Sequence, residues 1–128
     1  MLFVGTLTNR AEAADFIAAN GLTDDHVILR ATEGDRPVGY TAAVVYTEGQ
    51  DVSVHIAALE GEDDDICELL LRAAVNFGER RGAQKVTTAV SQPEKRLAAL
   101  GFRLIDGQMT TEVGNVVHMC KNCHNSGK

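Results

Sequence analysis

The segment Asp51–Gly82, DVSVHIAALEGEDDDICELLLRAAVNFGERRG, contains the strongest structural pattern in this chain. Its first part, Val52–Leu59, is rich in β-branched and apolar residues, which is typical of a buried strand. Six apolar residues then recur at helical spacing and form one stripe, which is wide enough to pack on a sheet: Ile66, Leu69, Leu70, Ala73, Ala74 and Phe77. The segment therefore predicts a strand, a tight acidic turn and a long helix that ends near Gly82.

The turn between this strand and this helix is strongly acidic. Six carboxylates fall within nine residues: Glu60, Glu62, Asp63, Asp64, Asp65 and Glu68. The helix dipole stabilises negative charge at an N-terminus, and Asp65 with Glu68 three residues later resembles a capping box. Two other interpretations remain open, namely oxygen ligands for Ca²⁺ or Mg²⁺ and a docking site for a basic peptide or polyamine.

Composition excludes several classes of function. The chain has 128 residues, a net charge of -6 and only 5% aromatic residues, so we expect one domain that binds neither nucleic acid nor anionic membranes. No apolar run approaches the roughly 20 residues of a membrane span, and the N-terminus lacks the pattern of a signal peptide. Three cysteines without such a signal favour reduced thiols and a cytoplasmic location.

The remaining patterns place other strands and helices around this segment. The predicted strands are Met1–Leu7, Val27–Ala31, Val38–Tyr46, Val52–Leu59, Lys85–Val90, Phe102–Ile105 and Val113–Met119; shorter helices are predicted at Ala11–Asn20 and Gln92–Leu100. Hairpin turns make Val52–Leu59 antiparallel to its predecessor, and a helical crossover makes Lys85–Val90 parallel to it. We therefore expect a single α/β (α+β) domain over residues 1–119, with a mixed sheet and helices on both faces, followed by a polar tail at 120–128.

At this point the chain resembles the GCN5-related N-acetyltransferase (GNAT) superfamily, over roughly Val27 to Met119. The run of antiparallel strands feeding a long helix is one similarity. RLAALGFRLIDG at Arg96–Gly107 is similar to the family's Y-x-x-L-G-F segment, and VVHMCK at Val116–Lys121 is similar to its closing hydrophobic-x-M-x-K strand. The resemblance implies a twisted, mainly antiparallel GNAT-type sheet. It also implies transfer of an acyl group from acetyl-CoA to a small amine or a protein amine.

The phosphate-binding turn implied by the resemblance is degenerate. In active members an Arg/Gln-x-x-Gly-x-Gly/Ala turn binds the CoA pyrophosphate through backbone N–H groups. Alignment on Leu70–Ala74 puts Glu62 at the Arg/Gln position, Asp65 at the first glycine and Cys67 at the second. Each carboxylate that lies ~4 Å from a phosphate charge costs roughly 4 kcal/mol at an effective dielectric near 20. The side chains of Asp65 and Cys67 also crowd a backbone that glycine leaves open. We therefore expect a poor pyrophosphate site.

The catalytic groups implied by the resemblance are also incomplete. The family's tyrosine, which protonates the departing thiolate, falls on Leu97. Asp51 and His55 are the candidates for the base, while Tyr40 and Tyr46 lie on the strand that would line the acceptor side. The pantetheine arm would bind the backbone of three residues: Ala57, Ala58 and Leu59.

Cysteines and histidines in the tail give one further candidate site. His118, Cys120, Cys123 and His124 are Cys and His ligands at knuckle spacing, and such residues bind zinc. A closed zinc site normally uses two separated knuckles, so a reduced tail without metal is favoured, and a dimer-shared zinc site is the alternative. Cys67 is interpreted as a structural thiol.

Two hypotheses about function follow. One is an active acyl-CoA-dependent N-acyltransferase. The other is a non-catalytic GNAT-like module that binds a ligand, a protein partner or a second copy of itself. The acidic turn and Leu97 favour the non-catalytic module, because both remove chemistry that the transferase needs.

Overall fold

The computed structural model describes residues 1–116 of the chain, as one mixed α/β unit. Its helices are the 3₁₀ helix η1 (Arg10–Ala13), α1 (Ala14–Ala19), α2 (Asp64–Glu79) and α3 (Glu94–Ala99). Its strands are β1 (Leu2–Thr6), β2 (Val27–Glu33), β3 (Arg36–Glu48), β4 (Asp51–Gly61), β5 (Lys85–Thr88), β6 (Arg103–Ile105) and β7 (Gln108–Glu112). The predicted organising segment is confirmed as β4 and α2.

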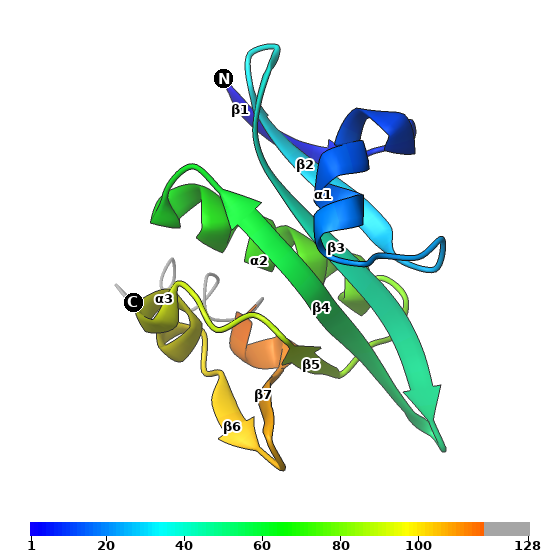
Figure 1. The fold of residues 1–128 in the computed structure, drawn as a ribbon. Helices are drawn as coiled ribbons and strands as arrows, with labels where there is room; N and C mark the ends of the chain where they lie inside the picture. Colours follow the sequence, from blue (N-terminus) through cyan, green and yellow to red (C-terminus); the bar gives the residue numbers. More distant parts are fainter. Residues whose placement is uncertain (117–128) are drawn as a thin grey trace.

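The seven strands form one sheet in the order β1-β2-β3-β4-β5-β7-β6. The β4–β5 pair is parallel, because α2 crosses over between these strands, and the other pairs are antiparallel. α1 covers one face of the sheet and α2 covers the other (Figure 1). The predicted mixed, mainly antiparallel sheet with helices on both faces is therefore confirmed.

The larger core lies between the sheet and α2. Val54 and Ile56 of β4 pack there with Leu71, Ala74 and Val75 of α2, and all five are fully buried. Gly78 lets α2 approach β4 closely, since a Cβ at this position would lie 2.5 Å from Val54 Cβ. The opposite face has a smaller core, in which Phe16 of α1 packs against Ile28, Ala42 and Ala58.

The end of the sheet differs from the sequence-based expectation. A strand was expected at Val113–Met119, but the partner of β6 is β7 at Gln108–Glu112, and residues 113–116 are helical. Asp106 and Gly107 have φ angles of 52° and 80°, so they form the two-residue turn that joins the hairpin directly. Residues 117–119 of the expected strand lie outside the described part of the chain.

The first helical region of the chain differs from the expectation in its first turn. The expected helix at Ala11–Asn20 begins instead as η1, whose N-cap Asn9 accepts a hydrogen bond from the Ala11 N–H. Within residues 1–116, no helix combines the length and the apolar character needed to cross a membrane.

Candidate functional site

The centre of β4 contains a β-bulge. Ala42 of β3 pairs with Ala58 and Ala43 pairs with Ile56, so Ala57 has no partner on β3. The extra residue reverses the alternation of the strand: Ile56 faces the α2 side of the sheet, whereas Ala58 belongs to the core on the α1 side. The Thr41 hydroxyl fixes this geometry by donating a 2.7 Å hydrogen bond to the Ala58 carbonyl.

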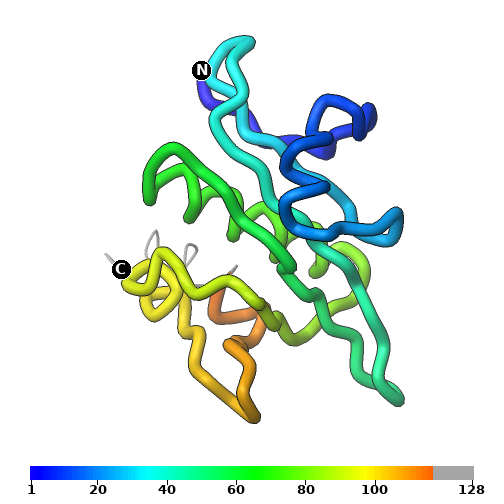
Figure 2. Tube along the Cα trace, in the orientation of Figure 1, coloured from blue at the N-terminus to red at the C-terminus, as the bar shows by residue number. Residues whose placement is uncertain are grey.

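The sheet opens immediately after the bulge. β5 pairs with β4 only from Ser53 to Ile56, while β4 continues to Gly61. The Thr88 hydroxyl and the Ala89 N–H both donate to the Ile56 carbonyl, at 2.8 and 3.2 Å, and end the pairing. Figure 2 shows the trace after β5 turning away from β4. The β4 edge at Ala57–Leu59 therefore faces no strand on this side, which is where the resemblance places the pantetheine arm.

The turn that leads into α2 satisfies several of its own backbone donors. Asp63 is the N-cap, and its Oδ1 accepts a 2.9 Å hydrogen bond from the Ile66 N–H. The Cys67 N–H donates to the Asp63 carbonyl, and the Glu62 N–H donates to the Val38 carbonyl. The expected capping role of Asp65 is wrong: the helix starts two residues earlier, and Asp63 has the extended backbone that an N-cap requires. A carboxylate of the chain therefore already occupies part of the site that a phosphate would use.

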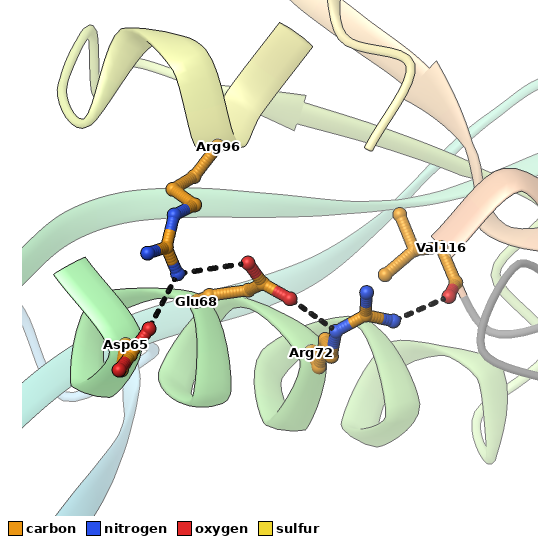
Figure 3. Close-up of polar contacts among 5 residues, drawn as sticks. All are labelled: Asp65, Glu68, Arg72, Arg96 and Val116. Carbon is orange, nitrogen blue, oxygen red and sulfur yellow. Dashed lines mark hydrogen bonds and ion pairs between the residues drawn. The ribbon is translucent and has the colours of Figure 1, made fainter. Parts of the chain in front are cut away.

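Two further acids of this region, Asp65 and Glu68, are held in ion pairs (Figure 3). Arg96 Nη1 of α3 lies 2.9 Å from Asp65 Oδ1 and 3.1 Å from Glu68 Oε1. Arg72 donates from Nε to Glu68 Oε2 at 3.1 Å and from Nη1 to the Val116 carbonyl at 3.0 Å. The hydrogen bond to Asp65 is the largest cause of the raised pKa of Arg96. The network joins α2 to α3 across the end of the sheet opening.

Glu62, at the position of the family's Arg or Gln, is paired as well. It forms an ion pair with Arg36 at the start of β3, and this hydrogen bond raises the pKa of Arg36. The position that would hold a cation for the pyrophosphate therefore holds an anion that already has a cationic partner. With Asp63 and Asp65 beside it, this turn does not fit a pyrophosphate.

Cys67, at the second glycine position, packs inside the turn. A Cβ on Gly61 would lie 2.9 Å from Cys67 Sγ, so the thiol lies directly on the backbone at the end of β4. Burial raises the pKa of the thiol, Asp64 and Asp63 raise it further, and Arg96 lowers it. The thiol thus remains protonated at neutral pH, as a structural cysteine does.

His55 is the candidate base that lies beside the sheet opening. Its Nδ1 is 2.8 Å from Thr87 Oγ1, and the Tyr46 hydroxyl is 3.3 Å from the same oxygen. Burial lowers the pKa of His55, and nearby His26 lowers it further. The imidazole is therefore neutral at physiological pH, in the form that can accept a proton. Sequence reasoning missed Thr87, because a threonine in a strand carries no signal of its function.

The other two catalytic candidates lie in different surroundings. Asp51 is the first residue of β4, six residues before Ala57 and thus about 20 Å from the bulge. Leu97, at the family's tyrosine position, is fully buried in the core below α3. Neither residue presents a polar group at the opening.

A cavity of about 530 Å³ lies on the opposite face of the sheet, beside α1. The Tyr40 ring stacks on Phe16 with their centroids 5.4 Å apart, and its hydroxyl is 3.5 Å from the Glu12 carbonyl. Asp15 and Glu60 also line this cavity. Tyr40 thus has a packing role in the smaller core as well as a position on a cavity wall.

Metal ligation finds no support in the described residues. Within residues 1–116, no three His, Cys, Asp or Glu side chains are grouped so that they could hold an ion. His118, Cys120, Cys123 and His124 lie outside the described residues, so the zinc hypothesis stays a prediction.

Comparison with solved structures identifies the fold. The ribosomal-protein-S18-alanine N-acetyltransferase from Escherichia coli superposes with a TM-score of 0.67 at 14% identity, over 88% of this chain and 94% of that chain. An N-acetyltransferase from Staphylococcus aureus Mu50 superposes with a TM-score of 0.64 at 14% identity, over 88% and 98%. An aminoglycoside acetyltransferase from an uncultured soil metagenomic sample, solved with trehalose, gives a TM-score of 0.58 at 13% identity, over 73% and 80%.

Sequence comparison adds no closer relative, since no protein-family model and no curated protein matches the chain. The structural likenesses show that residues 1–116 have the GNAT acetyltransferase fold. At these identities they establish the fold alone.

Proposed function

We propose that this GNAT-fold chain is a non-catalytic binding module that does not use acetyl-CoA. The observation that carries the proposal is the state of the α2 N-terminal turn. Its cap position is taken by Asp63, and Asp65 and Glu68 are paired with Arg96. A pyrophosphate would have to displace these carboxylates from Arg96. If the ion pairs stayed intact, the pyrophosphate would meet the negative charge of the turn without the attraction of a free Arg96.

The buried state of Leu97 supports the same proposal. A transferase of this fold needs a group that protonates the departing thiolate, and Leu97 has none and lies wholly in the core. The raised pKa of Cys67 removes the neighbouring thiol as a replacement acid–base group near neutral pH. With neither phosphate binding nor an acid, the fold would act through its surfaces.

The proposal is tested by isothermal titration of the reduced protein with acetyl-CoA and with CoA. We expect no saturable heat up to millimolar ligand. The matched variant combines Glu62→Arg, Asp65→Gly and Cys67→Gly, which restores the family's turn chemistry, and we expect it to gain measurable CoA binding. Saturable micromolar binding by the unaltered protein would refute the proposal.

An active N-acyltransferase is the second candidate, supported by one specific observation. The bulge at Ala57 and the end of β5 at Thr88 leave a free backbone edge beside the neutral His55. This arrangement suits a pantetheine arm and a base for an incoming amine. Under this alternative, His55→Gln would abolish turnover of a small-amine acceptor without changing acyl-CoA binding.

A further inference from the structure

β1 forms an edge of the sheet that lacks the usual protection. Its sequence, LFVGT, contains no charged residue and no proline, and Phe3 is 65% exposed. Natural edge strands normally carry lysines, prolines or bulges that prevent pairing with another chain. The opposite edge, β6, has three residues and begins with Arg103. β1 is therefore the edge that is better suited to pair with a further strand.

The register of β1 against β2 shows which backbone groups are free. The Leu7 N–H donates to the Ile28 carbonyl, and the Gly34 N–H donates to the Met1 carbonyl. The register between these ends is regular, with Leu2 opposite Glu33. Hydrogen-bonded pairs alternate along an antiparallel ladder, so the odd-numbered residues of β1 bond to β2. The N–H and C=O groups of Leu2, Val4 and Thr6 consequently point outward.

We propose that two copies of this chain associate by antiparallel pairing of their β1 strands across a two-fold axis at Val4. In this register Val4 pairs with Val4 of the second copy, and Leu2 pairs with Thr6. Each pair joins residues whose N–H and C=O groups point outward, so the two edges form about six hydrogen bonds. The arrangement is self-complementary, as a two-fold interface requires.

The side chains of β1 fit this register on the α2 face of the sheet. Val4 packs against the core on the α2 side of the sheet. Leu2 and Thr6 lie two residues away from Val4 on the same strand, so their side chains point to this face as well. A cavity of about 300 Å³ lies there between β1 and the C-terminal half of α2, and its lining includes Thr6 and Phe77. Leu2 of the second copy, paired with Thr6, enters this cavity and buries its exposed side chain.

The opposite face of β1 is complementary in the same register. Phe3 pairs there with Gly5 of the second copy. In a single chain the Phe3 ring covers its own Gly5, at 2.8 Å from the position of an added Cβ, so in the proposed pair each ring moves from its own Gly5 to Gly5 of the other copy. Cross-strand cover of an edge glycine by an aromatic ring stabilises such pairs.

Charges at the cavity favour a second copy over a strand of arbitrary sequence. Arg80 and Arg81, at the end of α2, line the cavity. Within one chain, Glu33 lies beside Leu2 on β2, shares its face and pairs with the N-terminal amine at 2.8 Å. In the proposed two-fold arrangement Glu33 also lies on the side of the arginines of the other copy, and this attraction acts against the repulsion between two chains that each carry a net charge of -6.

Sedimentation velocity over a concentration series tests the proposal, and its outcome does not depend on whether CoA binds. We expect a monomer–dimer equilibrium that Phe3→Lys weakens by at least about tenfold. Thr6→Pro removes an outward N–H without removing a β1–β2 hydrogen bond, and it should weaken the dimer similarly. Leu104→Lys is the matched control, because Leu104 is 71% exposed on the other edge strand, and it should leave the dimer unchanged.

Amide hydrogen exchange provides a residue-specific readout on the same samples. Exchange of the Val4 and Thr6 amides should slow as protein concentration rises, while exchange of the Gly5 amide, which bonds to β2 in both states, should not change. A monomer at every concentration would overturn the proposal. A dimer that tolerates Phe3→Lys and Thr6→Pro, or that is lost in Leu104→Lys, would overturn it as well.

Discussion

Asp63→Ala tests whether the acidic turn is stabilised internally. The change removes Asp63 Oδ1, which accepts a 2.9 Å hydrogen bond from the Ile66 N–H at the N-cap of α2. Loss of such a cap costs about 1 kcal/mol, and loss of the carboxylate at the positive end of the helix dipole adds about 0.3–1 kcal/mol. We therefore expect a loss of about 1–2 kcal/mol in the free energy of unfolding.

Two control variants separate the hydrogen bond from the charge. Asp63→Asn keeps the acceptor and loses the charge, so it should cost only the dipole contribution of about 0.3–1 kcal/mol. Asp64→Ala removes a neighbouring acid that is not the cap, and it should cost no more than the dipole contribution. Urea unfolding monitored by circular dichroism measures all three. If Asp63→Ala were no more destabilising than Asp64→Ala, the account of this turn would be refuted.

Three further predictions concern the core and the histidine. Leu97→Ala should lower the free energy of unfolding by about 2–5 kcal/mol in urea titrations, because Leu97 is fully buried; a loss below about 1 kcal/mol would contradict its core position. Gly78→Ala should destabilise by about 1–3 kcal/mol despite the better helix propensity of alanine, because its Cβ would overlap Val54; an unchanged melting temperature would contradict this packing. The pKa of His55 is lowered in the folded chain, so as pH falls the unfolded chain binds a proton at this histidine first. The free energy of unfolding should therefore fall as pH drops below about 6.5. In urea titrations at several pH values, His55→Gln should reduce this dependence.

The sequence predicted the parts of the fold that depend on local patterns. The apolar stripe from Ile66 to Phe77 defined α2, and the β-branched run before it defined β4. The last hairpin was misplaced because the apolar residues from Val113 onward were read as a strand. The Asp106–Gly107 pair was the stronger signal, since it is the preferred sequence for a two-residue turn.

The candidate site was less accessible to prediction, because its features are not local. The ion pairs of Arg96 with Asp65 and Glu68 join two helices, and residue spacing carries no information about such contacts. The bulge at Ala57 also depends on pairing with β3, and AAL at Ala57–Leu59 has no glycine or proline to mark it. The proposed loss of phosphate binding, in contrast, was suggested directly by the residues at the family's glycine positions, Asp65 and Cys67.

The most direct test of the central claim is a two-dimensional amide NMR titration of the protein with CoA. The backbone amides of Asp64, Asp65 and Ile66 are the groups that would contact a pyrophosphate at the α2 N-terminus. We predict that these three resonances do not shift at millimolar CoA, because Asp63 and the Arg96 ion pairs already occupy the turn. Saturable shifts of these amides at micromolar CoA would contradict the account.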